Sequence, residues 1–165
     1  MLSITEWAAV FTAVASAFAA MFLLFELRHM HKHRDLEITM KLFEWAETDN
    51  LRKAFRWVET KFEFVTLEKY KIDLADKFEV SDYPYQVEAY FEEVGFLVNK
   101  KFVEIDVIVD RLGGHIVSDW RKLEPWIRAI RKERADETFG EHFELLYNKT
   151  IIYMKKTPSQ QLNHS

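Results

Sequence analysis

An uninterrupted apolar run near the N-terminus is the strongest constraint that this sequence places on its fold. Nineteen consecutive residues, Trp7 to Phe25, carry no charged side chain. As a helix rising about 1.5 Å per residue, such a run spans about 28 Å, close to the ~30 Å hydrocarbon core of a bilayer. Trp7 lies where an interfacial aromatic anchor is expected. The run therefore predicts a transmembrane helix, with an anchor over residues 1–27.

Two other interpretations of this run are weaker. A cleavable signal peptide begins with basic residues, whereas no Lys or Arg precedes Arg28. Ala15-Ser16-Ala17 resembles a cleavage site, but the apolar run continues beyond it. A helix buried in a soluble core rarely stays uncharged for five turns.

Basic residues directly after the run predict its orientation. Arg28, Lys32 and Arg34 follow it, and only Glu6 is charged before it. By the positive-inside rule, the N-terminus faces out and the following residues are cytoplasmic, with these three cations at the lipid headgroups. His29 and His33 share a helix face with Glu37, which is also a metal-ligand spacing, but a cationic collar is the simpler interpretation.

Small side chains gather on one side of the predicted span. Such a face lets transmembrane helices approach closely, so it predicts self-association of the chain within the bilayer. The alternative is a simple alanine-rich anchor. The predicted face consists of Ala9, Thr12, Ala13, Ser16, Ala17 and Ala20.

The rest of the chain is expected to be helical. Glycine and proline together number only seven among 165 residues, which disfavours a turn-rich sandwich or barrel. Apolar residues recur at helical spacing from residue 36 to residue 154, whereas residues 157–165 are polar. The expected fold is all-α: a transmembrane helix that continues into a helical bundle over residues 28–156, followed by a polar tail over residues 157–165.

Capping and breaking residues suggest where these helices begin and end. Thr66 is a candidate N-cap, and Ser81-Asp82-Tyr83-Pro84 combines a capping side chain with a proline in the first turn. Leu51 to Val65 is expected to present apolar residues on one face. Gly113-Gly114 is expected to end a short helix, and Pro125 to kink or break the next one.

Residues with evident chemistry are few. Without cysteine there is no disulfide, thiolate metal site or cysteine nucleophile, and a net charge of −4 disfavours nucleic-acid binding through bulk charge. No phosphate-binding glycine loop, nucleophile elbow or HExxH motif occurs, so no enzyme, cofactor or metal is predicted. A cationic helix is a candidate contact for RNA or another anion, although a solvated bundle face is the simpler interpretation. The candidate contact residues are Arg121, Arg128, Arg131, Arg134 and His142.

Three segments carry a resemblance: YFEEVGFLVNKKFVEIDVIVDRLGG (Tyr90 to Gly114), DWRKLEPWIRAIRKE (Asp119 to Glu133) and EHFELLY (Glu141 to Tyr147). They resemble an uncharacterised bacterial family with one N-terminal membrane helix and a small helical domain. The resemblance covers nearly the whole chain and implies an inner-membrane protein, but it brings no catalytic residues.

A more distant likeness is to the pore-forming membrane accessory protein of type VI-B CRISPR loci, which is related to the HEPN fold. It implies a ring of protomers that acts on the membrane in phage defence. HEPN ribonucleases carry an arginine, four to six residues and then a histidine. Arg28 and His33 have this spacing at the membrane boundary, whereas seven residues lie between Arg134 and His142. This departure puts nuclease activity in doubt.

These features support three hypotheses. The first is a non-enzymatic, self-associating membrane protein whose oligomer permeabilises or remodels the bilayer. The second is a membrane-tethered HEPN-like domain that binds or cuts RNA. The third is an anchor that presents a docking surface to a cytoplasmic protein.

Overall fold

The computed structural model describes residues 3–75 and 78–157, and within them the chain forms seven helices and no strand. The predicted all-α class is thereby confirmed. Contacts divide the chain into two compact units, Met1–Ile38 and Thr39–Ser165; we call the second one the helical domain. The polar tail lies outside the described residues except for Thr157. Side chains outside the described set are those of Ile4, Glu6, Leu24 and residues 8–11, 27–34 and 78–79.

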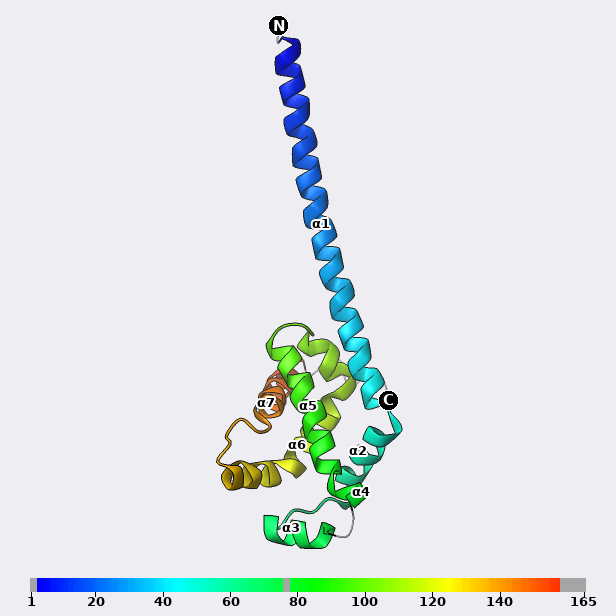
Figure 1. Ribbon diagram of the computed structural model, residues 1–165, viewed down its shortest axis with the longest axis vertical. Helices are drawn as coiled ribbons and strands as arrows, with labels where there is room; N and C mark the ends of the chain where they lie inside the picture. Colours follow the sequence, from blue (N-terminus) through cyan, green and yellow to red (C-terminus); the bar gives the residue numbers. More distant parts are fainter. Residues whose placement is uncertain (1–2, 76–77, 158–165) are drawn as a thin grey trace. The chain divides into compact units, whose positions relative to one another are not determined.

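Helix α1, Ile4–Ala46, includes all of the predicted apolar run and the basic stretch after it (Figure 1). No proline or glycine interrupts it, so a single helix over 43 residues is locally favoured. Among the helices formed by residues that the structure describes, none is both long and apolar enough to cross a membrane. The predicted transmembrane helix is therefore not confirmed.

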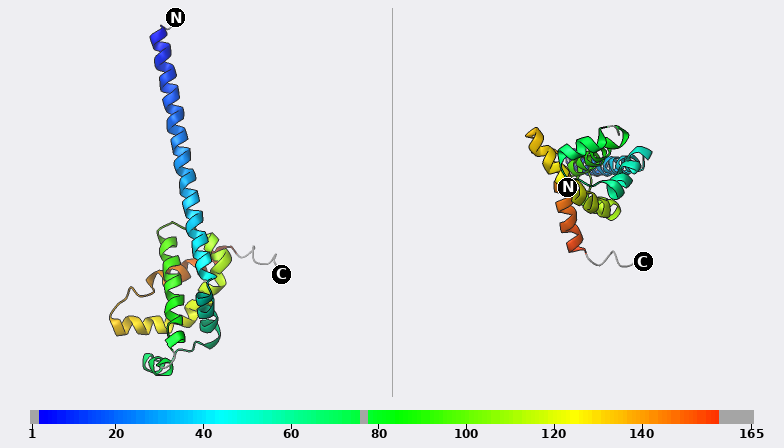
Figure 2. Two further views of the ribbon diagram at one scale, coloured as in Figure 1. Left: turned by 45° about the vertical axis from the view of Figure 1, so that its right-hand side comes forward. Right: turned by 90° about the horizontal axis from the view of Figure 1, so that it is seen from below.

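In the helical domain, α5 (Tyr83–Asn99) is the central element. Helices α2 (Asp49–Lys61), α6 (Ile105–Arg134) and α7 (Glu141–Lys156) all pack against it (Figures 1 and 2). The shorter helices α3 (Leu67–Leu74) and α4 (Phe78–Ser81) lie between α2 and α5 in the chain. Every side chain of α3 is at least partly exposed, so the core is made by the other helices.

Aromatic side chains fill the core where α5, α6 and α7 meet. Phe91 stacks on Phe143 with ring centroids 4.7 Å apart, and Trp120 meets Phe143 edge-on at 5.0 Å. Tyr90 adds an edge contact to Phe91 at 5.2 Å. Such pairs stabilise by roughly 0.5–1.5 kcal/mol beyond the burial of their area.

Local capping signals agree with the structure. The Thr66 hydroxyl accepts a hydrogen bond from the backbone N–H of Lys69 at 3.2 Å and caps α3. Helix α5 begins at Tyr83 with Pro84 in its first turn, as predicted, but its N-cap residue Asp82 makes no capping hydrogen bond through its side chain. Val65, expected to face the core, is 65% exposed. The reason is that α2 ends at Lys61, so helical spacing does not extend to Val65.

The predicted break at Gly113-Gly114 is wrong, because α6 continues through both glycines and through Pro125. A glycine that ends a helix usually takes a left-handed conformation, and neither of these does. Gly113 is instead a packing position: an added Cβ would lie 2.9 Å from the Cε of Met154 on α7. Helix α6 ends at Arg134 and is followed by the C-cap residue Ala135, whose φ of 51° is left-handed.

Two helices approach closely at Gly95, where α5 crosses the start of α7. A Cβ added at Gly95 would lie 2.1 Å from the carbonyl oxygen of His142. Because that neighbour is backbone, it can move only if α7 moves. The absence of a side chain at Gly95 therefore sets the separation of α5 and α7.

Substituting Gly95→Ala should destabilise the protein by roughly 2 kcal/mol or more, because it overpacks a helix crossing. Gly114→Ala is the matched control, since nothing lies within 4 Å of its added Cβ and alanine favours a helix interior. That variant should gain up to about 1 kcal/mol. Urea unfolding monitored by circular dichroism measures both. Equal stability of the two variants would contradict the proposed role of Gly95.

Candidate functional site

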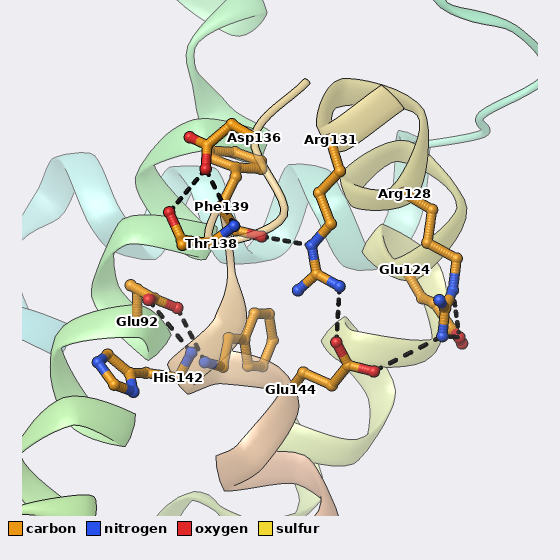
Figure 3. Close-up of polar contacts among 10 residues, drawn as sticks. Glu92, Glu124, Arg128, Arg131, Asp136, Thr138, Phe139, His142 and Glu144 are labelled. Atoms are coloured by element: carbon orange, nitrogen blue, oxygen red, sulfur yellow. Dashed lines mark hydrogen bonds and ion pairs between the residues drawn. The ribbon is translucent and has the colours of Figure 1, made fainter. Parts of the chain in front are cut away.

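The richest set of polar contacts surrounds the first turn of α7. Glu92 on α5 accepts two backbone hydrogen bonds there, from His142 N–H to Oε1 at 3.2 Å and from Phe143 N–H to Oε2 at 2.9 Å (Figure 3). The first N–H groups of a helix lack partners within the helix, so an external carboxylate is favourable at this end. Glu92 thus fixes the start of α7 against α5.

Arg131 on α6 secures the same region from the other side. Its guanidinium donates from Nε to the carbonyl oxygen of Phe139 at 2.7 Å and from Nη1 to Oε2 of Glu144 at 2.7 Å (Figure 3). Arg131 is buried, and its Nη2 has no hydrogen-bond partner among the described residues. A buried arginine held in this way joins α6, the following loop and α7.

Arg128 and Arg134 of α6 are also engaged with neighbouring side chains. Arg128 binds the Glu124 carboxylate through Nε at 2.9 Å and Nη2 at 2.7 Å. Arg134 donates to the Tyr85 hydroxyl at 3.2 Å and lies over the rings of Tyr85 and Phe139. The structure thus brings Arg128 and Arg134 to the α6–α7 junction but binds them to internal partners.

The remaining candidate anion contacts diverge. Nδ1 of His142 lies 3.1 Å from Nδ2 of Asn99, and its ring packs 5.4 Å from that of Phe96. Arg121 is exposed. The five candidate anion-contact residues thus do not form a continuous cationic stripe. Their arrangement is closer to a solvated bundle face whose charges are paired with neighbours.

The sequence analysis did not identify two acidic residues that are buried in the helical domain, Glu88 and Asp119. Glu88 is 5% exposed, and burial, reinforced by the charge of Glu92, raises its pKa to about 8. Arg134, Arg131 and a backbone hydrogen bond from Gly140 partly oppose that rise.

Asp119 is the second buried acid. Burial, together with the charge of Glu59, raises its pKa to about 7, while Ser118 and Lys122 act in the opposite direction. Its Oδ2 has no hydrogen-bond partner among the described residues. Helical spacing was the available signal: Glu88 is three residues before Phe91, and Asp119 is three after Ile116.

Residues predicted on α1 have mixed outcomes. Five small residues of the predicted self-association face have described side chains, and all are exposed: Thr12, Ala13, Ser16, Ala17 and Ala20. Their role in self-association stays a prediction. Outside the residues with described side chains lie Ala9, Arg28, His29, Lys32, His33 and Arg34. No group of three or more potential metal ligands occurs within the described part of the chain.

The two buried acids predict an unusual pH dependence of stability. In the unfolded chain each acid ionises at its ordinary pKa, 4.5 for Glu88, whereas folding keeps it protonated to higher pH. The contribution is therefore fully present below the ordinary pKa and is lost as pH rises to about 8 for Glu88 and about 7 for Asp119. The free energy of unfolding should fall by about 2 kcal/mol or more between pH 5 and pH 8.

Urea unfolding at several pH values tests this for Glu88→Gln, whose neutral amide cannot ionise. The variant should show a shallower fall than the wild-type protein. Glu93→Gln is the matched control, because Glu93 is an exposed neighbour on the same helix. Parallel pH profiles for Glu88→Gln and the wild-type protein would contradict the assignment.

Comparison with known proteins identifies a family but no function. No curated protein matches the chain, and no solved structure matches it. The distant likeness to the CRISPR accessory protein is therefore unsupported. A family model described as "Domain of unknown function (DUF4760)" matches residues 10–150, which is more than four fifths of the chain. The protein therefore belongs to the DUF4760 family.

Proposed function

We propose that this protein is a non-enzymatic membrane anchor that inserts the apolar run of α1 into a bilayer and self-associates there. The observation that carries the proposal is the exposure of large apolar side chains along α1. Met21, Phe22 and Leu23 are each more than 60% exposed, and Phe18 is 63% exposed.

Exposed apolar surface of this kind requires a partner. Burying a side chain such as Phe or Leu stabilises by about 1.5–3 kcal/mol, so four such side chains on one segment favour transfer out of water. Contiguous apolar patches on a protein surface mark membrane or protein contacts. Because the run from Trp7 to Phe25 also lacks charge on every side, lipid is a better match than a one-sided protein groove.

The helical domain, in contrast to the apolar run of α1, buries apolar side chains in a core of its own. Four of its aromatic side chains are fully buried: Trp126, Tyr90, Phe91 and Phe143. A domain that buries its own core does not need a bilayer to fold. Membrane attachment is therefore assigned to the first unit, Met1–Ile38, with the cationic residues 28–34 at the headgroups and the helical domain on the cytoplasmic side.

Contacts between copies are assigned to the small-residue face of α1. Thr12, Ala13, Ser16, Ala17 and Ala20 are exposed, and small side chains allow backbones of neighbouring helices to approach closely in lipid. An oligomer formed in this way could enclose a conducting path, and leakage of dye from vesicles at high protein density measures whether it does.

The alternative RNA-binding function receives less support from the side chains. Salt-dependent RNA binding requires cations that are free to replace counterions at phosphates. Arg128, Arg131 and Arg134 are instead held by Glu124, Glu144 and aromatic neighbours. These contacts favour a structural role for the arginines of α6.

Flotation of the full chain with phosphatidylcholine–phosphatidylglycerol vesicles tests insertion. The wild-type protein should rise with the vesicles even in about 1 M salt, which screens the attraction between cationic side chains and headgroups. Salt does not weaken the burial of apolar side chains. The double variant Phe18→Glu with Phe22→Glu should remain in the dense fraction, since charged residues within the hydrocarbon core cost about 2.5 kcal/mol or more each.

Ile152→Glu is the matched control for flotation, because Ile152 is an exposed apolar residue of α7 in the helical domain. It should float like the wild-type protein. A wild-type chain that stays in the dense fraction, or an Ile152→Glu variant that behaves like the α1 variant, would refute insertion through α1.

Native mass in mild detergent, after subtraction of detergent mass, tests self-association. The double variant Ala13→Leu with Ala17→Leu should shift the distribution toward the monomer, because added bulk keeps the helices apart. Val14→Leu with Phe18→Leu is the matched control, because both residues lie outside the small-residue face, and it should leave the mass unchanged. A monomeric wild-type protein would rule out self-association and leave a simple anchor.

A further inference from the structure

A hollow of about 270 Å³ lies between α2 and α6 in the helical domain, beside the end of α1. Arg52 and Arg56 on α2 form one wall, and His115 on α6 belongs to the opposite one. Nothing in the sequence analysis pointed to this place, because its arginines on α2 and its His115 ring on α6 are more than 50 residues apart in the chain.

The two arginines of the hollow differ from those of α6. They are exposed and one helical turn apart, and neither guanidinium forms a hydrogen bond or ion pair with any residue that the structure describes. Arg111, in contrast, already pairs with Glu47 at 3.5 Å. A second hollow of about 140 Å³ is lined by the same two arginines together with Asp49 and Lys53.

Apolar and ring side chains form part of the remaining surface of the hollow and are held by the core behind them. Leu112 is buried, and the Phe55 ring lies 5.8 Å from the His115 ring at 38°. Phe55 is held from behind by Tyr90 and Phe91, with centroid distances of 5.6 Å to each. The hollow therefore combines a fixed ring surface with two guanidinium groups that lack partners in the described chain.

We propose that this hollow binds a small phosphate monoester with an apolar or aromatic body. A guanidinium presents paired donors that match phosphate oxygens, and two of them one turn apart can hold one phosphate. The rings of Phe55 and His115 accept a flat apolar group beside it.

Size and charge narrow the class of ligand. A volume of about 270 Å³ is below the ~300–1,000 Å³ of pockets that hold drug-sized ligands. Glu59 also lines the hollow, and its negative charge offsets the positive charge of one arginine. Glu47 lines the hollow too, but it is paired with Arg111. A single phosphate therefore matches the site better than a polyphosphate does.

Titration calorimetry of the full chain in mild detergent tests the proposal with phenyl phosphate, inorganic phosphate and phenol. Phenyl phosphate should bind most tightly, because only it uses both the arginines and the ring surface. Arg52→Gln and Arg56→Gln should each weaken its binding by about tenfold or more, the loss expected for one charge-assisted hydrogen-bond donor.

Arg121→Gln is the matched control, since Arg121 is an exposed arginine of α6 that does not line the hollow. It should bind phenyl phosphate like the wild-type protein. All three variants should keep the wild-type melting temperature, because these arginines are exposed. Failure of phenyl phosphate to bind, or equal binding by Arg56→Gln and the wild-type protein, would overturn the proposal.

Short-chain dibutyryl phosphatidate distinguishes two sources of this chemistry. Tighter binding of phosphatidate than of phenyl phosphate, lost in Arg56→Gln, would support the site and assign it to a lipid headgroup. The reverse order would support the site and assign it to a soluble metabolite. Because these ligands are tested in detergent, the result is independent of bilayer insertion by α1.

Discussion

The backbone contact between Gly95 and His142 is the constraint on which the helical domain depends. It sets the separation of α5 and α7, and with it the depth at which Phe143 enters the core to stack on Phe91. Glu92 then holds the first N–H groups of α7 at this crossing. Steric fit and capping act at the same place, so neither α5 nor α7 can shift without losing both.

The polar residues around this crossing explain why a charged helix need not be a binding surface. Arg131 joins α6 to Glu144 and to the backbone of Phe139, and Glu88 lies buried nearby with a raised pKa. A buried ion pair is weak evidence for stability, because desolvation offsets its Coulombic attraction. In this domain, Arg131 joins α6 to the start of α7.

Features of the fold that depend on neighbouring residues were predictable from the sequence, whereas features that depend on distant residues were not. Thr66 and Pro84 mark helix starts through local geometry, and the structure has both. Gly113 has the signature of a helix end, but it lies within α6 and packs against Met154, which lies 41 positions later in the chain. The candidate anion hollow was missed for the same reason, since only folding brings Arg56 to His115.

The central claim is that α1 enters lipid while the helical domain stays in water. The chain has no cysteine, so Phe18→Cys and Ile152→Cys each create one unique position for a nitroxide spin label. Paramagnetic relaxation by oxygen and by a nickel chelate, measured with the full chain on vesicles, reports lipid and water exposure respectively. We expect the label at position 18 to be relaxed by oxygen and shielded from nickel, and the label at position 152 to show the opposite. Equal access of nickel to both labels would contradict the account.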